Sequence, residues 1–263
     1  MSLTEIFRQA EKSAIIRNAH AVNTGRPPEL KNTQNDFFFL CRRAPDRLVQ
    51  TVVELCRQRL PNNMGIPAEQ IQVLSPTRKG VCGTVNLNRA LQAALNPPAA
   101  GKRQKLWGDM VFREGDRVMQ TRNNYDVVWE KDDGAMGAGI FNGDVGVIQE
   151  IDPSGELITI QFDDRTCVYT ADLLNQLDMA YAMTVHKAQG SEYRCVVLVS
   201  AAVAPALMVR GVLYTAITRA RELLVLVGDD VAPGQMAAND RQQRRYSGLR
   251  RRLREEAANH GME

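Results

Sequence analysis

The sequence predicts an α/β fold that is interrupted by a small β-rich insert, and three observations support this prediction. Strand-like and helix-like segments alternate over the first hundred residues, which is the pattern of an α/β layer. From about residue 108 to 172 the segments become short strands separated by Gly, Asp and Asn turns. The continuous apolar runs 196–199 and 223–227 then suit strands buried on both faces of a parallel sheet.

The spacing of apolar residues and the turn residues between them place the first elements in order. They are expected to be a helix at 13–23, a strand at 37–40, a helix at 46–60, a strand at 71–74 and a helix from 84 to 95. Pro61 is expected to close the second helix, and Thr84 is a candidate N-cap for the third.

The insert is predicted to be a small β-barrel. Its strand candidates are 117–121, 145–151, 157–162 and 167–170, and a polar, glycine-rich loop is expected from 123 to 143. The predicted organisation is therefore an α/β domain in two segments, 1–107 and 173–238, around a barrel insert at 108–172, with a basic tail at 239–263. The tail has seven arginines between 240 and 256, and a solvated helix and a nucleic-acid contact are both open interpretations of it.

Composition narrows the classes of protein to consider. The chain has 263 residues, 44% of them hydrophobic, and a net charge of +3, which permits a polyanionic partner without requiring one. Its five cysteines are scattered and form no CxxC pair, which argues against a disulfide framework or a zinc site. No apolar run approaches the ~18 residues of a membrane span, so we expect a soluble, cytoplasmic protein.

Two arginines are candidates for contact with phosphate. Arg8 follows two apolar residues in LTEIFRQ and would project from a strand or turn edge, with an ordinary surface arginine as the alternative. Arg219 lies in YTAITRAR, just ahead of the run 223–227, so we expect a helix end to present it beside the ligand crevice of the sheet. An arginine there can neutralise charge on a transferred phosphoryl group, and a solvated helix end is the alternative.

Two polar segments offer further candidates. In TVHKAQGSEY, residues 184–193, Gly190 would let a backbone N–H approach a phosphate, Glu192 could accept from a ribose hydroxyl, and His186 could meet a nucleic-acid strand. The segment SPTRKG, residues 75–80, follows a predicted strand and offers hydroxyl groups and positive charge to backbone phosphates. Ordinary polar loops are the alternative in both places.

Several catalytic signatures are missing from the sequence. It has no GxxxxGK[ST] phosphate loop, since its only Gly-Lys pair, at 101–102, is followed by Arg103. No Ser-His-Asp, HExxH or paired-carboxylate nuclease pattern is present, and we expect no resident metal site. Asp229 and Asp230 follow an apolar run, but without a phosphate loop they are interpreted as turn residues.

Five segments in order, LTEIFRQ, SPTRKGVCGTVNLN, FNGDVG, YAMTVHKAQGSEY and YTAITRAR, resemble the C-terminal part of RecD-like superfamily-1 DNA helicases. This is the family of the exodeoxyribonuclease V alpha subunit, and the resemblance covers nearly the whole chain. It implies a second RecA-like motor domain of the P-loop NTPase type, without its own P-loop, interrupted by an SH3-like barrel. The first motor domain, which bears the P-loop, would lie upstream, and the chain would be a fragment. The segment 125–141 is longer than the family pattern.

The resemblance also assigns roles to residues. Arg8 and Arg219 would be arginine fingers at the γ-phosphate, and Gly190 and Glu192 would contact the nucleotide. Single-stranded DNA would lie along Ser75, Thr77, Thr184 and His186. ATP and Mg²⁺ would bind the complete protein only.

The implied function is a motor in DNA recombination and repair, with 5′-to-3′ polarity, that is inactive as an ATPase without the N-terminal motor domain. Its partners would be that domain, single-stranded DNA and, as further candidates, other recombination subunits. The alternative is a non-enzymatic single-stranded nucleic-acid binding module.

Overall fold

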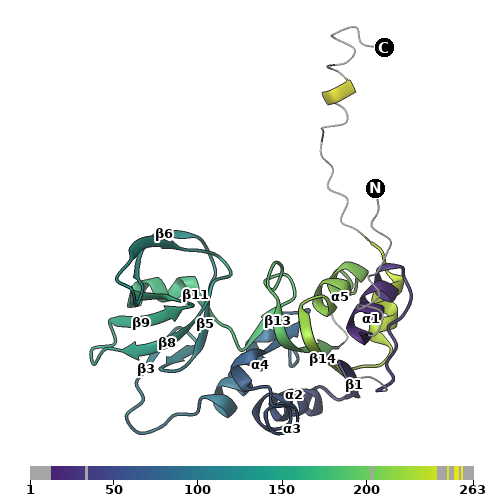
Figure 1. Ribbon diagram of the computed structural model, residues 1–263, viewed down its shortest axis with the longest axis horizontal. Helices are drawn as coiled ribbons and strands as arrows, with labels where there is room; N and C mark the ends of the chain where they lie inside the picture. Colours follow the sequence, from purple (N-terminus) through teal and green to yellow (C-terminus); the bar gives the residue numbers. More distant parts are fainter. Residues whose placement is uncertain are drawn as a thin grey trace.

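The computed structural model describes residues 13–32, 35–201 and 204–241, together with 248, 252–254 and 256 (Figure 1). The structure is built around a five-stranded parallel sheet and a seven-stranded sheet. None of the described helices has the length and the apolar character that a bilayer span requires.

The parallel sheet confirms the predicted α/β class. Its strands lie in the order β1, β14, β13, β2, β12, and every neighbouring pair is parallel. Their bounds are β1 Phe37–Cys41, β2 Ile71–Ser75, β12 Ala182–Thr184, β13 Tyr193–Ser200 and β14 Ala220–Gly228.

Helices cover both faces of this sheet. The helices are α1 Ala14–Asn23, α5 Arg210–Ile217 and α6 Ala232–Ala238 on one face, and α2 Pro45–Glu54, α3 Leu60–Met64 and α4 Thr84–Leu95 on the other. Successive side chains of a strand point to opposite faces. In β13, Val196 and Leu198 therefore pack with the first set of helices, while Val197 and Val199 pack with the second. Burial on both faces explains why β13 and β14 are continuously apolar.

The second helix continues past Pro61, where the sequence predicted its end. A π-helical segment, η2 Leu55–Arg59, joins α2 to α3, and the Leu60 N–H donates to the carbonyl of Leu55, five residues back. The ring of a proline crowds the carbonyl four residues before it, and the wider π turn upstream relieves that conflict. The helix ends at Gly65, whose φ of 62° lies in the left-handed region.

The insert follows α4 and contains every strand from β3 to β11. A hairpin of β3 Gln104–Trp107 and β4 Met110–Arg113 precedes the seven-stranded sheet, whose order is β11, β5, β8, β9, β10, β6, β7. The strands of this sheet are β5 Arg117–Gln120, β6 Asn124–Glu130, β7 Met136–Ile140, β8 Val145–Ile151, β9 Leu157–Phe162, β10 Arg165–Thr170 and β11 Leu177–Met179. Closure of this sheet into a barrel stays a prediction, as do the domain boundaries at 107, 172 and 238.

The predicted loop at 123–143 is instead largely the antiparallel hairpin of β6 and β7, so that prediction was wrong. Trp129 pairs with Gly137 across the two strands, and a Cβ atom on Gly137 would lie 2.3 Å from the indole ring. Gly137 therefore serves to accommodate Trp129. The turn contains Gly134 at a φ of +82°, the Asp-Gly signal of a hairpin that the glycine-rich composition obscured.

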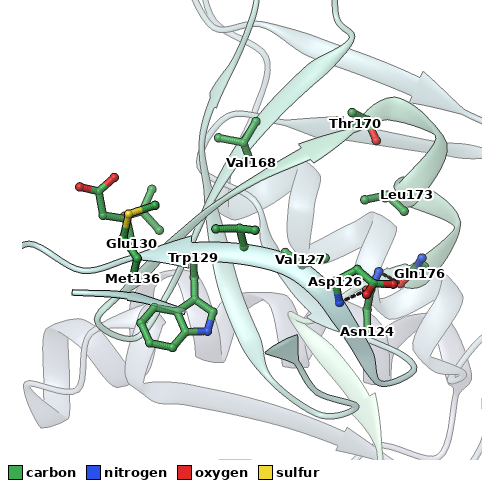
Figure 2. Close-up of a pocket in the computed structure, with 12 residues that line it drawn as sticks. Asn124, Asp126, Val127, Trp129, Glu130, Met136, Val168, Thr170, Leu173 and Gln176 are labelled. Atoms are coloured by element: carbon green, nitrogen blue, oxygen red, sulfur yellow. Dashed lines mark hydrogen bonds between the residues drawn. The ribbon is translucent and has the colours of Figure 1, made fainter. Parts of the chain in front are cut away.

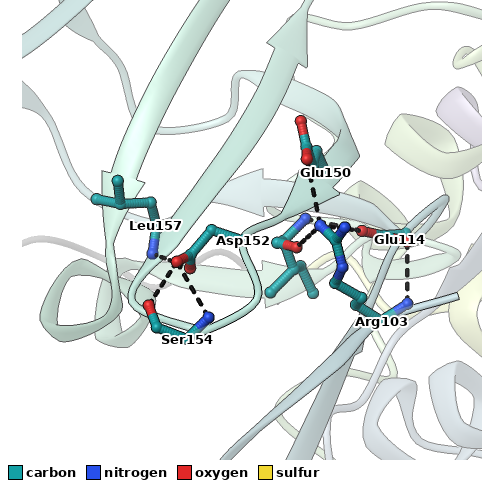
Figure 3. A network of polar contacts seen from close by, with 7 residues as sticks. Arg103, Glu114, Glu150, Asp152, Ser154 and Leu157 are labelled. Atoms are coloured by element: carbon teal, nitrogen blue, oxygen red, sulfur yellow. Dashed lines mark hydrogen bonds and ion pairs between the residues drawn. The ribbon is translucent and has the colours of Figure 1, made fainter.

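A polar network ties the start of the insert to β8 (Figure 3). The Arg103 guanidinium donates to Glu150 at 3.2 Å and to the carbonyl of Ile151, and its ion pair with Glu114 measures 3.8 Å. Burial alone would raise the pKa of Glu114, but hydrogen bonds from the Ile151 and Arg103 N–H groups lower it overall. In the next turn, hydrogen bonds led by the Ser154 hydroxyl lower the pKa of Asp152 to about 2. Both carboxylates are thus charged at neutral pH.

A buried carboxylate joins the insert to the α/β domain. Asp116 is fully buried just before β5 and accepts hydrogen bonds from Gln92 at 2.6 Å and Asn96 at 2.7 Å, both on or next to α4. It also accepts from the Arg113 N–H at 2.7 Å and from the Tyr181 hydroxyl at 2.9 Å. Burial and the neighbouring Asp116 charge raise the pKa of Tyr181, so its hydroxyl stays a donor.

Candidate nucleotide and nucleic-acid interface

Arg219 lies in the turn between α5 and β14, and its guanidinium contacts the TVHKAQGSEY segment. Its Nη1 donates to the carbonyl oxygen of Ser191 at 2.8 Å, while Nε donates to Thr215 O and Nη2 to Thr218 Oγ1, each at 3.1 Å. The Tyr193 N–H donates in return to the carbonyl of Arg219 at 2.8 Å. The fold therefore brings together two segments that lie about thirty residues apart in sequence.

The structure corrects the expected position of Arg219 at the carboxyl ends of the strands. Arg219 immediately precedes β14, so it lies at the amino end of that strand. Tyr193, its backbone partner, begins β13 at the same edge of the sheet. A helix that returns to a parallel strand must end at the amino edge, which is why the crevice rule for open α/β sheets does not locate this arginine.

Gly190 and Glu192 flank Ser191, the residue whose carbonyl accepts from Arg219, and both are exposed. Gly190 has a φ of +88°, and a Cβ atom at this position would meet no other atom within 4 Å. The left-handed backbone conformation is therefore the reason for a glycine here. Glu192 forms no ion pair or side-chain hydrogen bond within the described part of the chain. Its carboxylate is therefore available to a ligand.

The four predicted DNA-binding residues gather at the opposite, carboxyl edge. Ser75 ends β2 and pairs in register with Thr184, which ends β12. Thr77 and His186 follow in the loops after these two strands. His186 is exposed, whereas Ser75 is fully buried. The Ser75 hydroxyl donates to the carbonyl of Cys82 at 2.8 Å and accepts from the Thr77 N–H, so it orders the loop that carries Thr77.

The loop after β2 folds back over the start of α4. The Thr84 N–H donates to the carbonyl of Thr77 at 3.0 Å and the Val85 N–H to that of Arg78 at 3.2 Å. The N-cap is Gly83, and not Thr84 as the sequence predicted. Glycine is required at this position because a Cβ atom would lie 2.5 Å from the carbonyl oxygen of Lys79. This close approach fixes the SPTRKG loop against the helix.

A groove of about 590 Å³, which we call the junction groove, lies between this loop region and the insert. Its apolar side chains include Trp107 and several methionines, and Thr184 and Lys187 line it from the α/β domain. At its rim, Asp178 on β11 accepts from Lys187 at 3.0 Å and from Arg78 at 3.4 Å. Arg89 on α4 is exposed at the same rim and has no ionic partner among the residues that the structure describes.

A second groove, of about 610 Å³, lies on the insert alone and is called the insert groove here (Figure 2). Trp129, Met136 and Val168 give it an apolar floor, and Asn124 and Gln176 join across it by a 3.0 Å hydrogen bond. Its only charged lining residues are Asp126 and Glu130, both exposed carboxylates. The two grooves thus differ in the sign of their charge.

Sequence reasoning missed Trp107, Arg89 and Asp178, because each becomes part of the interface only when the insert packs beside α4. A signal was present for the first of them. The Gly108-Asp109 turn in LWGDM marks a tight hairpin, with Gly108 at a φ of +57°, and such a turn would have placed Trp107 at an exposed tip.

Arg8, the other predicted finger, lies outside the described residues. Within the described ranges no three His, Cys, Asp or Glu side chains come together in a way that could hold a metal ion.

Two families of helicase domains match the chain. The ATP-dependent RecD-like DNA helicase SH3 domain matches residues 87–162, and the UvrD-like helicase C-terminal domain matches residues 179–227. The second match covers both the TVHKAQGSEY and YTAITRAR segments.

Two relatives in sequence agree with these matches. The ATP-dependent RecD2 DNA helicase of Deinococcus radiodurans is 34% identical over 97% of this chain, which corresponds to 32% of that protein. The RecBCD enzyme subunit RecD of Mycolicibacterium smegmatis is 31% identical over 71% of this chain and 30% of its own length. A crystal structure of the Pif1 helicase from Bacteroides, in complex with ADP-AlF3 and single-stranded DNA, aligns with 99% of this chain and 57% of its own at 16% identity and a TM-score of 0.49.

The matched domains and the relatives in sequence identify the chain as a portion of a DNA helicase. Within that class the chain belongs to the RecD-like helicases. It spans about a third of the length of the curated relatives that it matches.

Proposed function

We propose that this chain is the second motor half of an ATP-dependent DNA helicase of 5′-to-3′ polarity that acts in recombination and repair. It would supply arginine fingers and single-stranded DNA contacts to an ATP site shared with an N-terminal motor domain. ATP and Mg²⁺ would bind the complete protein, with the phosphate loop on that other domain. The observation that carries the proposal is the 2.8 Å contact of Arg219 with Ser191, which joins the two motif segments at one edge of the sheet.

On the nucleotide side, Arg219 and Arg8 would meet the γ-phosphate, and Gly190 and Glu192 would contact the rest of the nucleotide. The Arg219 guanidinium donates to the carbonyls of Ser191 and Thr215 and to the hydroxyl of Thr218. None of these acceptors is a carboxylate. Its positive charge is therefore not neutralised within the described residues and is available to phosphate. Attraction between this charge and phosphate held by the other domain would favour a closed cleft, and loss of the γ-phosphate would release it.

On the DNA side, Thr77, Thr184 and His186 would contact the strand, and Ser75 would act by ordering the loop of Thr77. The side-by-side ends of β2 and β12 support this assignment, since they put the loops that carry these residues at one edge. Contacts to the phosphates and sugars of DNA carry no sequence information, so binding of this kind would not depend on the base sequence.

ATP turnover is the measurement that tests the proposed function. With saturating single-stranded DNA, the chain alone is expected to show no turnover, and the complete parent protein to hydrolyse ATP and unwind DNA with a 5′ overhang. Clear turnover by the chain alone would contradict the shared site, and unwinding only from a 3′ overhang would contradict the polarity.

Removing the Asp178 carboxylate is expected to strengthen DNA binding. Asp178 competes with phosphate for Lys187 and Arg78, so Asp178→Asn frees both cations. We expect the Kd for a single-stranded oligonucleotide to fall by about two- to fivefold, with a steeper dependence on salt. Fluorescence anisotropy at several salt concentrations measures both quantities.

Asp109→Asn is the matched control for this effect. Asp109 lines the same groove, is exposed, and has no ionic partner among the described residues, so the substitution changes the net charge equally and releases no cation. An equal gain in both variants would mean that net charge alone, and not the release of Lys187 and Arg78, sets the affinity.

A further inference from the structure

The junction groove combines an aromatic ring, a flexible apolar floor and a cationic rim. Trp107 and Met110 pair at the tip of the β3–β4 hairpin and line the groove from the insert. Met179 and Met183 line it from the segments on either side of the return to the motor domain. Methionine side chains adapt to ligands of varied shape, and a half-buried tryptophan offers a stacking surface.

We propose that the junction groove holds an unstacked nucleobase of single-stranded DNA, stacked on the indole of Trp107. This inference rests on the proposed function, because it extends the path of the strand beyond the four residues at the carboxyl edge. Thr184 belongs to both places, since it ends β12 and also lines the groove. A strand that passes Thr184 would therefore lie at the mouth of the groove.

The charges at the rim fit the phosphates that accompany such a base. Arg78, Arg89 and Lys187 contribute three cations, against the carboxylates of Asp109 and Asp178. Arg78 and Arg89 are both exposed, so phosphates on either side of the base would meet cations without desolvating them first. A pocket for a free apolar ligand would not require this ring of charge.

The two amide side chains that line the groove, Asn88 and Gln92, have no free N–H group with which to identify the base. Both N–H bonds of the Asn88 amide are taken, by the carbonyls of Met179 and Ala182, at 3.1 and 2.9 Å. The Gln92 amide nitrogen donates to Val111 O and to Asp116. Recognition would therefore come from stacking, which every base offers, and the groove would accept any base.

The insert groove provides a built-in comparison. It also contains a half-buried tryptophan, Trp129, but its charged residues are the carboxylates Asp126 and Glu130, which repel phosphate. The chain has only these two tryptophans. Each groove can therefore be followed by the fluorescence of its own indole.

The test uses two variants of the 263-residue chain, each with one tryptophan. Trp129→Phe keeps Trp107, and Trp107→Phe keeps Trp129. Titration with oligo(dT) is expected to quench the fluorescence of Trp129→Phe and to leave that of Trp107→Phe unchanged, while the anisotropy of a labelled oligonucleotide shows that both bind. An oligonucleotide made wholly of abasic sites should bind without quenching Trp107.

Affinity gives the second readout. Trp107→Ala is expected to weaken oligo(dT) binding by about tenfold, within the range for loss of one base–aromatic stack, and to leave the binding of the abasic strand unchanged. Trp129→Ala should leave both affinities unchanged.

The possible failures are distinguishable. Binding of oligo(dT) with no quenching of Trp107, or with equal quenching by the abasic strand, would overturn the base-binding groove and leave the proposed function intact. Absence of any binding by anisotropy would overturn the DNA contacts of the proposed function, and the groove with them.

Discussion

Arg219→Ala in the complete parent protein is expected to lower the rate of ATP hydrolysis by about 10³- to 10⁵-fold, the range known for arginine fingers. The guanidinium is held beside the Gly190–Tyr193 loop by its 2.8 Å bond to Ser191, and alanine removes both the charge and that bond. Single-stranded DNA affinity should change by less than about threefold, because the predicted DNA contacts lie at the other edge of the sheet. Steady-state turnover and fluorescence anisotropy are the two measurements.

Arg221→Ala is the matched control, because Arg221 is two residues further along, is exposed, and has no ionic partner within the described ranges. It should retain turnover close to that of the unmodified protein. Arg219→Lys keeps the charge but loses the planar donor set, and it should recover only a small part of the rate. Loss of DNA binding with normal turnover in Arg219→Ala would refute the role of a finger.

Asp116→Ala is expected to destabilise the protein by about 3–5 kcal/mol, because four hydrogen bonds in a buried site lose their acceptor and each such loss costs about 1–3 kcal/mol at most. The substitution leaves the Tyr181 hydroxyl without its acceptor and removes one of two acceptors from each of the Gln92 and Asn96 amides. At about 2–4 °C per kcal/mol for a chain of this size, the Tm should fall by about 10 °C. Urea denaturation and a thermal scan of the chain measure the effect.

Asp126→Ala provides the comparison for this stability effect. Asp126 is an exposed carboxylate of the insert with no side-chain partner within the described residues, and its loss should change the free energy of unfolding by less than about 0.5 kcal/mol. If Asp116→Ala changed the free energy of unfolding equally little, water would have to replace the lost carboxylate as the hydrogen-bond acceptor. The site would then be open to water, although Asp116 is fully buried.

The parallel sheet could be predicted from sequence because its central strands are buried on both faces. Residues 196–199 and 223–227 are continuously apolar, and only the centre of a parallel sheet requires that pattern. The β6–β7 hairpin escaped prediction because it has one exposed face and carries many acidic residues, so its composition is that of a loop.

The residues of the candidate site also form two groups, one that the sequence could predict and one that it could not. Gly190, Glu192 and Arg219 stand in motifs whose order along the chain can be recognised, and the structure places them in neighbouring turns. The junction groove could not be predicted, since Arg89, Trp107 and Asp178 lie on three elements that meet only through the packing of the insert. Arg219 precedes its strand in the sequence, so its place at the amino edge follows from chain order, which the crevice rule does not consider.

The loop from 185 to 192 leaves Thr184 at the carboxyl edge of the sheet and reaches Tyr193 at the amino edge. Val185 and Ala188 anchor it in the core, while Lys187 reaches the insert through Asp178 and Ser191 holds Arg219. Eight residues thus connect the proposed grip on DNA to the proposed sensor of phosphate. A pull on the strand at one end would reach the guanidinium at the other through the backbone of these eight residues and the single hydrogen bond from Arg219 to the carbonyl of Ser191.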